Sequence, residues 1–414
     1  LNAFIMPYTH FRFISYEVPT ILSNRFNLDP GAVGNAPQLP NINAANSLSA
    51  DARIRVQRLL KVMTTAANYM TNNFNENNTC YIFAAPEFYF RPATVQANAA
   101  GKYHYSYTRT ERNNIVATLR EYIKNHAIFD DWLIFPGTII YKSVRAQGKD
   151  IHYNESVRFW RWTTNNGASR CSTSTFKKVD VSDADGMVAD AHDKPMRSKR
   201  NDADEINKHY FTWRRINIGV DICLEHAFHY RVAKKAFKNY TAVPAHAFNG
   251  PAPYTTVNLH LIMAGGMPLA ITNEDVNGGQ FREMHDYAPG AALPAQRSIA
   301  ARVNGHVLRI DGLNRRNVSA SQLFRVDGLT QNERELDLID NPDGSTTERV
   351  TFPAINSLDN WYQGIANPIT HITAGITTIA INNAHDAYMA APNGVNANSW
   401  MPAQNIKIYP RTAV

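Results

Sequence analysis

Cys223 stands where an apolar, strand-like run ends, and its thiol is the group in this chain best placed to act as a nucleophile. The run covers residues 216–222, and a helix is predicted over residues 228–237 soon after it. A strand holds the thiol rigidly, a turn exposes the sulfur, and amides that open a helix can stabilise negative charge beside it. The alternative is that Cys223 is a small buried hydrophobic residue, as many free cysteines are.

A carboxylate occupies a comparable place earlier in the chain. Glu87 follows the apolar segment 80–85 and has Pro86, Phe88 and Tyr89 as its neighbours in sequence. A carboxylate in apolar surroundings loses part of its hydration, which suits it to act as a general base. The alternative is that Glu87 pairs with a basic group at the end of a strand.

Two lysines lie in the second strand of a predicted hairpin, whose strands cover residues 156–162 and 173–181 and are joined by an Asn-Asn-Gly turn. Side chains alternate along a strand, so Phe176 and Lys178 share one face and Lys177 takes the other. A lysine that faces inward beside an aromatic ring is unusual unless it is paired, and its ammonium could stabilise an oxyanion. A solvent-facing lysine pair on an edge strand is the alternative.

Helical and strand patterns alternate around these side chains. Apolar residues at helical spacing predict a helix from residue 52 to about 69, with Asp51 as its N-cap, and a second helix from 108 to 126. Apolar runs predict further strands at 4–14, 80–85, 132–138 and 257–264, and a helix that passes into a strand over 297–309.

This alternation predicts an α/β fold, and continuously apolar strands suit a sheet that is covered on both faces. No internal repeat or clear linker divides the chain, so we expect a single domain over residues 1–414. Residues 182–209 are polar and irregular and are expected to be an insertion. Residues 330–414 are expected to form a C-terminal extension of loops, with one strand at 375–381.

Composition limits the classes of partner. The chain has 414 residues, a net charge of +7 and 44% hydrophobic residues, and its densest basic run is 194–200. The positive charge favours an acidic protein partner, but the run is also typical of a solvated loop. Nucleic acid is not an expected partner, because the sequence has no helix-turn-helix, zinc pattern or basic-aromatic stripe. No apolar run is long enough to span a bilayer.

The cysteines indicate the compartment. Cys80, Cys171 and Cys223 are an odd number with wide spacing, which fits neither a disulfide framework nor a zinc site. We expect a reducing, cytoplasmic location; the sequence has no classical secretion signal, and export by another route stays open.

The order Glu87, Lys178, Cys223, each at a strand end, resembles the nitrilase (carbon–nitrogen hydrolase) superfamily. The segments around these residues are similar to family motifs as well: Ala85-Pro86-Glu87, Tyr153-Asn154-Glu155-Ser156, Phe176-Lys177-Lys178-Val179, Ile218 to Glu225, Leu261 to Ala264 and, more distantly, Ala301 to Val307. The resemblance covers roughly residues 1–310, with insertions.

The resemblance implies a four-layer α-β-β-α sandwich of the nitrilase type and a thiol mechanism without cofactor or metal. Glu87 would be the general base, Cys223 the nucleophile, and Lys178 with the backbone amide of Leu224 would hold the oxyanion. Glu225 matches an acidic family position next to the nucleophile.

Five further residues near these motifs are weaker candidates. His226 is expected to pack more than to catalyse. Many family members carry a second glutamate after the lysine, for which the candidates here are Glu205 and three aspartates, Asp180, Asp183 and Asp185.

The function expected from this resemblance is hydrolysis of a non-peptide carbon–nitrogen bond through a thioester acyl-enzyme, with an amide favoured over a nitrile. The substrate would be a small-molecule amide or the side-chain amide of a peptide. An acyl transferase or a side-chain deamidase that acts on a protein partner is an alternative, because both share the acyl-enzyme. A catalytically silent binding or scaffold protein with this fold is the other alternative. A homo-oligomer is also expected.

Overall fold

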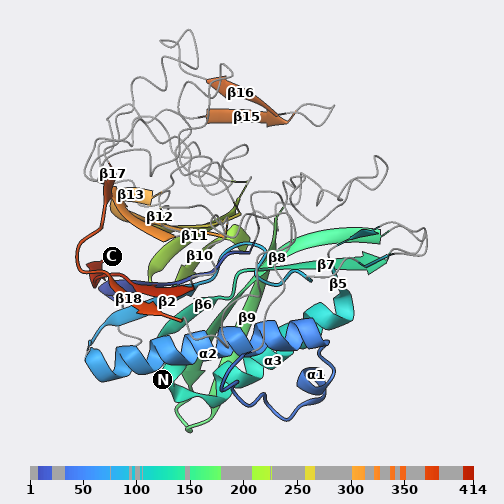
Figure 1. The fold of residues 1–414 in the computed structure, drawn as a ribbon. Coiled ribbons are helices and arrows are strands. Elements are labelled where there is room, and N and C mark those ends of the chain that lie inside the picture. Colours follow the sequence, from blue (N-terminus) through green and yellow to red (C-terminus); the bar gives the residue numbers. More distant parts are fainter. Residues whose placement is uncertain are drawn as a thin grey trace, which may run out of the picture.

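The computed structural model of the chain describes residues 8–20, 33–74, 76–92, 96–97, 103–104, 106–144, 150–178, 208–223, 225, 257–265, 301–312, 321–326, 336–340, 346–350, 369–381 and 404–414. Within them, strands form one sheet of ten strands, one of six and two small two-stranded sheets (Figure 1). The sequence prediction of an α/β fold is confirmed, because helices and both parallel and antiparallel strands are present.

The ten-stranded sheet has the order β18-β19-β1-β2-β6-β8-β7-β5, with β20 paired to β1 and β9 paired to β8. Its centre is parallel from β1 through β2 to β6, and β8 runs antiparallel to β6, β7 and β9. The strands are β1 (His10–Glu17), β2 (Thr79–Ala84), β5 (Tyr107–Thr108), β6 (Trp132–Phe135), β7 (Thr138–Val144), β8 (Asp150–Thr163), β9 (Ser169–Lys177), β18 (Thr377–Ala380), β19 (Asn405–Ile408) and β20 (Thr412–Ala413).

The six-stranded sheet has the order β10-β11-β12-β13-β14-β17, and β11, β12 and β13 are parallel. Its strands are β10 (Tyr210–Trp213), β11 (Ile216–Ile222), β12 (Val257–Ala264), β13 (Ala301–Asp311), β14 (Ser321–Val326) and β17 (Ile369–His371). The small sheets pair β3 (Gln96–Ala97) with β4 (Tyr103–His104) and β15 (Leu336–Asp340) with β16 (Thr346–Val350).

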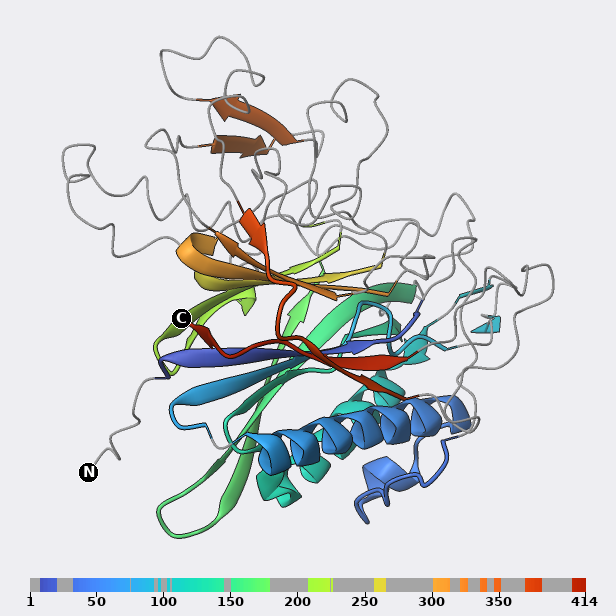
Figure 2. The same ribbon diagram turned by 60° about the vertical axis from the view of Figure 1, so that its left-hand side comes forward.

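Two long helices, α2 (Ala50–Asn73) and α3 (Arg109–Asn125), run beneath the ten-stranded sheet; a short helix α1 (Asn43–Asn46) and a 3₁₀ turn η1 (Ala127–Phe129) accompany them (Figures 1 and 2). The prediction that Asp51 caps the first helix was wrong. The N-cap is Ser49, whose hydroxyl accepts a hydrogen bond from the amide of Ala52, and Asp51 lies in the first turn, where it pairs with Arg55. Both residue types can cap a helix, so the direction in which the chain enters decides between them.

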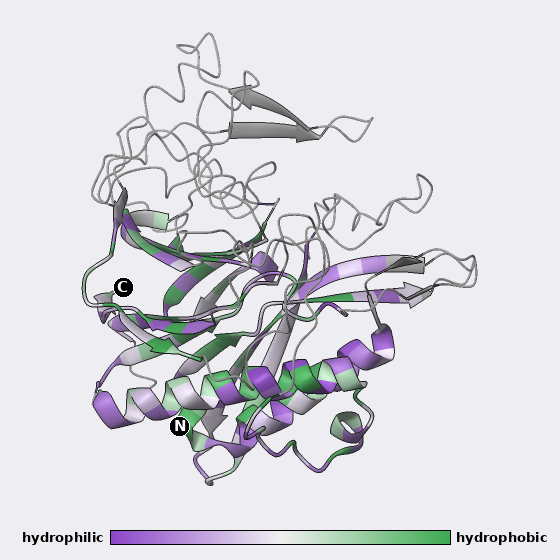
Figure 3. Ribbon diagram, in the orientation of Figure 1, coloured by the Kyte–Doolittle hydropathy of each residue, from purple (hydrophilic) through white to green (hydrophobic). Residues whose placement is uncertain are grey.

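Two apolar cores separate these layers. One lies between the helices and the ten-stranded sheet and contains Leu59 of α2 and Phe83 of β2. The other lies between the two sheets and contains Phe13 of β1 with Val220 and Leu261 of the smaller sheet. Figure 3 shows hydrophobic residues gathered on the inner strands and alternating with hydrophilic residues along α2 and α3. The strands of the larger sheet are therefore covered on both faces, as their apolar sequences predict.

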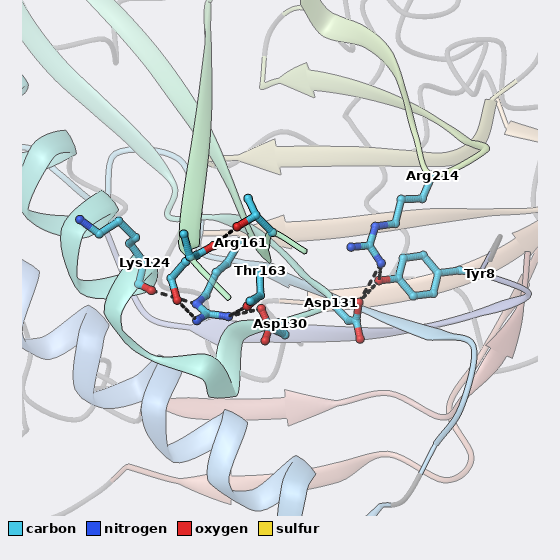
Figure 4. A network of polar contacts seen from close by, with 10 residues as sticks. Tyr8, Lys124, Asp130, Asp131, Arg161, Thr163 and Arg214 are labelled. Atoms are coloured by element: carbon cyan, nitrogen blue, oxygen red, sulfur yellow. Dashed lines mark hydrogen bonds and ion pairs between the residues drawn. The ribbon is translucent and has the colours of Figure 1, made fainter. Parts of the chain in front are cut away.

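Ion pairs lie at the edge of the larger sheet where β1, β2 and β6 begin (Figure 4). Arg161 of β8 pairs with Asp130 and donates to the carbonyl of Lys124 at 2.9 Å, which ties the hairpin of β8 and β9 to the end of α3. Arg214, in the turn between β10 and β11, lies 2.9 Å from Asp131 of the larger sheet's edge. The contact of Arg214 with Asp131 joins the two sheets at the edge where these three strands begin.

The prediction of loops for the last eighty residues was wrong. Besides β18, this region contributes β15, β16, β17, β19 and β20, and both β19 and β20 pair with β1. These strands are short and only partly apolar, so their sequences carry little periodicity, and their stability comes from pairing with distant strands.

Several predicted segments lie outside the described residues, namely 4–6, 182–207, 228–237 and 297–300. Among the helices that the structure describes, none combines the length and the apolar character needed to cross a membrane.

Candidate active site

Glu87 lies in the tight loop that follows β2, and its side chain is completely buried. The amide of Ala85 still bonds to Phe135 of β6, at 2.9 Å, and the amide of Phe88 donates to the hydroxyl of Thr138 at 2.8 Å. Phe88 has a positive φ of 64°, a conformation that non-glycine residues rarely adopt. Hydrogen bonds on both sides therefore fix where the Glu87 carboxylate points.

Gly137 makes this loop possible. A Cβ at Gly137 would lie 2.4 Å from the carbonyl oxygen of Pro86 and 2.8 Å from Cβ of Tyr89, and its φ is +85°. Only glycine combines that conformation with such a close approach. The turn between β6 and β7 thus packs directly against the segment that carries Glu87.

Lys178 follows β9 and turns into the same place. Its ammonium lies 2.9 Å from Oε1 of Glu87, and its own amide donates to the carbonyl of Asn154 on β8 at 2.8 Å. The side-chain amide of Asn154 donates to the same carboxylate oxygen at 2.8 Å. Oε1 of Glu87 therefore accepts from one cation and one neutral donor. Asn154 belongs to the Tyr153-Asn154-Glu155-Ser156 motif, but its contact with Glu87 was not predicted from the sequence.

Lys177 takes the other face of the strand, as the alternation of side chains predicts. Its ammonium lies 4.5 Å from the centroid of the Tyr153 ring. Phe176, in contrast, belongs to the core between the sheets together with Cys223. The lysine that shares the inter-sheet face with Cys223 is therefore Lys178.

Cys223 is the first residue after β11 and is 5% exposed. Its φ is +50°, the left-handed region, which costs a non-glycine residue on the order of 1 kcal/mol and persists only where the surroundings enforce it. Its amide donates to the carbonyl of Met263 on β12 at 2.8 Å. The thiol is therefore carried by a sharp turn that is anchored to the neighbouring parallel strand.

Gly265 connects the cysteine and glutamate segments. It follows β12, whose Met263 is the register partner of Ile222, so Gly265 and Cys223 lie at the same end of adjacent parallel strands. A Cβ on Gly265 would come within 2.9 Å of Oε2 of Glu87 and 2.6 Å of the Phe88 ring. The structure thus places all three candidate segments at one edge of the two sheets. No local sequence pattern points to Gly265.

Glu225 is also buried and supports the turn at Cys223. Its Oε2 accepts a hydrogen bond from the amide of Ile222 at 3.1 Å, which closes the segment from β11 to residue 225. Leu224, His226 and Glu205 lie outside the described residues. The same holds for the three aspartates considered as stand-ins for a second glutamate, Asp180, Asp183 and Asp185.

A buried pair of Asp221 and His260 lies close to Cys223 along the strands but on the wrong face. Asp221 and His260 are both fully buried, and their side chains are 2.8 Å apart. Val220 and Ile222 of β11 face the core between the sheets. Because side chains alternate, Asp221 faces away from that core, so the pair is not aimed at the Cys223 site.

The other two cysteines are poorly suited to nucleophilic chemistry. Burial raises the pKa of Cys80 well above its ordinary value and the pKa of Cys171 to about 12. Both residues are free and buried, and a thiol rather than a thiolate is a weak nucleophile. In the part of the chain that the structure describes, no cluster of three or more His, Cys, Asp or Glu residues could hold a metal ion.

No protein-family model matches the sequence, and no curated protein matches it. Among solved structures, the chain is similar to an amidase from Nesterenkonia sp., with a TM-score of 0.32 and 11% identity over 86% of this chain and 91% of the amidase. A mutant of the Nesterenkonia AN1 amidase, described as an enzyme of the nitrilase superfamily, has a TM-score of 0.32 and 10% identity over 84% and 89% of the two chains.

Another similar solved structure is the glutamine-dependent NAD⁺ synthetase from Acinetobacter baumannii, with a TM-score of 0.32 and 10% identity over 82% of this chain and 43% of the synthetase.

Proposed function

We propose that the chain is a cysteine-dependent hydrolase that cleaves a non-peptide carbon–nitrogen bond, in the manner of an amidase. The observation that carries the proposal is the buried ion pair of Lys178 and Glu87 at the edge where Cys223 ends β11 in a left-handed turn. An acid–base group, a fixed cation and a thiol at one edge are the three parts that acyl transfer to a thiol requires.

Acylation begins with the removal of the thiol proton. Oε1 of Glu87 is engaged by Lys178 and Asn154, so we assign the proton transfer to Oε2, the oxygen nearest Gly265. The thiolate of Cys223 attacks the carbonyl carbon of the amide, and the C=O electron pair moves onto oxygen. The ammonium of Lys178 and the amide of Leu224 stabilise that oxyanion.

Collapse of the tetrahedral intermediate breaks the carbon–nitrogen bond. Glu87 returns its proton to the leaving nitrogen, and the acyl group stays on Cys223 as a thioester. Glu87 then takes a proton from water, the hydroxide adds to the thioester carbon, and the second intermediate expels the Cys223 thiolate, which recovers a proton. The net reaction is amide plus water to acid plus amine, with no external oxidant or reductant.

The proposal extends to the architecture, a single domain with the four-layer α-β-β-α arrangement. The described residues supply the helices, both sheets and the two cores. On the outer face of the smaller sheet, His260 is 0% exposed and Arg309 is 3% exposed, so that face is covered as well. A covered outer face is what a fourth layer would produce.

The substrate class that we propose is a small amide, with the side-chain amide of a peptide as the alternative and a nitrile less favoured. Acyl transfer to an amine instead of water uses the same thioester, so it differs only in the second step. The positive net charge of +7 favours an acidic partner if the amide belongs to a protein.

The test is intact mass spectrometry after brief mixing with small amides, nitriles and glutamine- or asparagine-containing peptides. We expect a mass increase that maps to Cys223 and is absent in Cys223→Ala, with Cys171→Ala as the matched control that keeps the adduct. The added mass identifies the acyl group. An adduct that persists in Cys223→Ala would refute the nucleophile. No adduct with any compound, together with slow iodoacetamide labelling of Cys223, would support the scaffold alternative.

A further inference from the structure

His209 is a buried histidine that touches both strands of the candidate site. It immediately precedes β10 and is 1% exposed. Its Nδ1 lies 2.9 Å from the carbonyl oxygen of Val220, and its Nε2 lies 3.0 Å from the carbonyl oxygen of Lys177. One carbonyl belongs to the strand that ends at Cys223, and the other directly precedes Lys178.

The two acceptors determine the protonation state of the ring. A carbonyl oxygen can only accept a hydrogen bond, so each ring nitrogen has to donate one. A neutral imidazole carries a single N–H, and one of its nitrogens would then place a lone pair against a carbonyl lone pair. The imidazolium carries two N–H groups and satisfies both contacts. The geometry at Val220 and Lys177 therefore fits the charged form of His209.

A countercharge is present next to the ring. Oε2 of Glu225 lies 3.6 Å from Nδ1 of His209, and the Glu225 side chain is fully buried. On another side the ring meets Phe176 edge-on, with centroids 5.2 Å apart. The ammonium of Lys177 lies over the Tyr153 ring on the opposite face of its strand. Among the described residues, Glu225 is thus the ionisable side chain that the structure brings against the ring.

We propose that His209 is a buried imidazolium that positions the lysine and cysteine segments of the site relative to each other. The same oxygen of Glu225 that faces His209 also accepts the amide of Ile222. A cation, a carboxylate and a backbone amide therefore form a chain that runs from Lys177 to the residue before Cys223. The positioning role rests on the proposed function, whereas the charge state does not.

The first experiment measures the charge state directly. In full-length protein labelled with ¹⁵N-histidine, the ring of His209 is identified in the wild type by its proximity to Phe176 and by the loss of its signals in His209→Gln. Two-bond ¹H–¹⁵N correlations at neutral pH should show both nitrogens protonated. The pattern of a neutral tautomer would overturn the proposal.

The countercharge gives a second test that leaves the histidine in place. In Glu225→Gln the carboxylate is gone, so the ring should shift toward the neutral form at the same pH. An unchanged doubly protonated ring would show that Glu225 does not hold the charge. Glu225→Gln also keeps the charge state of His209 testable if His209→Gln does not fold.

The positioning role is tested by kinetics and by thiol reactivity. In His209→Gln we expect kcat to fall between about tenfold and a hundredfold with KM little changed, because the reacting groups are misplaced while substrate contacts remain. The rate of Cys223 alkylation should fall in parallel. His126→Gln, which alters a partly buried histidine at the end of α3, is the matched control and should change neither.

The outcomes separate the two proposals. A doubly protonated ring with wild-type kcat and alkylation rate in His209→Gln would overturn the positioning role alone. If the wild type turns over no amide, the proposed function fails. The protonation of the His209 ring and the alkylation rate of Cys223 still test the charge state and the positioning role of His209.

Discussion

The ammonium of Lys178 lies 2.9 Å from Oε1 of Glu87, and both side chains are fully removed from solvent. Moving two charges out of water costs several kcal/mol for each ion, and their attraction recovers this only with good geometry and further hydrogen bonds. Asn154 supplies one such bond to the same oxygen. A buried ion pair adds little stability compared with apolar packing. We therefore assign the pair a catalytic role rather than a stabilising one.

Alanine variants of the two adjacent lysines should differ strongly in catalytic rate. Lys178→Ala should lower the rate on the order of 10²–10³-fold, because a donor to the oxyanion is lost. Lys177→Ala should change it little, because its ammonium lies over Tyr153 on the other face. Steady-state kinetics on the substrate found by mass spectrometry measures both variants. A larger loss in Lys177→Ala would show that the wrong lysine has been assigned.

Stability has to be measured in the same variants. Lys178→Ala leaves Glu87 buried without its cation, which costs about 3–5 kcal/mol. The double variant Glu87→Gln with Lys178→Met removes both charges and should recover most of that loss while staying inactive. Recovery of activity in the double variant would contradict both assigned roles.

Asn154 is expected to hold the glutamate in its productive orientation. Asn154→Asp replaces the donor by a second carboxylate, and two adjacent carboxylates do not both ionise at neutral pH. Glu87 then shares a proton with its neighbour and is a poorer base, so kcat at neutral pH should fall about tenfold or more and recover partly as the pH rises. Asn166→Asp, in the exposed hairpin turn, is the control. A pH–rate profile identical to that of the wild type would exclude this role.

Gly265 is expected to tolerate no side chain. In Gly265→Ala the new Cβ would lie 2.6 Å from the Phe88 ring and 2.9 Å from Oε2 of Glu87. Overpacking of this kind costs roughly 1–3 kcal/mol and displaces its neighbours, so the rate should fall on the order of tenfold or more. Gly375→Ala is the control, since its φ of +71° costs stability far from the site. Chemical denaturation and kinetics together separate the two effects, and a full rate in Gly265→Ala would refute the contact.

The buried Glu155 should make the stability of the folded protein depend on pH. Burial raises the pKa of Glu155 above its ordinary value, against the opposing charge of Arg112. The folded state then binds this proton more tightly than the unfolded state does, so its stabilisation is complete below the ordinary glutamate pKa and is lost as pH rises through the raised pKa. Free energies of unfolding across this range should fall in the wild type and fall less in Glu155→Gln.

Glu121 provides a control of opposite sign. Hydrogen bonding to Lys124 lowers the pKa of Glu121, so its contribution is present above the ordinary glutamate pKa and is lost as pH falls through the lowered one. Glu121→Gln should therefore be less stable than the wild type above the ordinary glutamate pKa, and this difference should disappear at the acid end. The same slope in wild type and Glu155→Gln would show that Glu155 does not titrate in this range.

The sequence predicted the elements that have strong local patterns. The eight residues of β12 are all buried, so a predominantly apolar run marked the strand correctly. The hairpin of β8 and β9 followed from its turn, and alternation along β9 separated Lys178 from Lys177. In these cases the information lies in neighbouring residues.

The features that sequence analysis missed depend on contacts between distant segments. His209 precedes a short strand and has no local pattern; its role appears only when β9 and β11 lie on either side of it. Gly265 is unremarkable until the loop of Glu87 packs against it. Only Ile406 and Ile408 of β19 are buried, which is too weak a pattern to predict a strand.

The pairing of β1 with β19 has a consequence for biosynthesis. Ile14 is the register partner of Ile408, so almost the whole chain is made between the two halves of this pairing. Until residues 404–414 leave the ribosome, β1 presents one open row of backbone donors and acceptors. An open strand edge is a template for pairing with other chains, so the nascent protein is exposed to aggregation until these residues have emerged. Truncation within these residues should therefore yield insoluble protein rather than a slightly smaller active one.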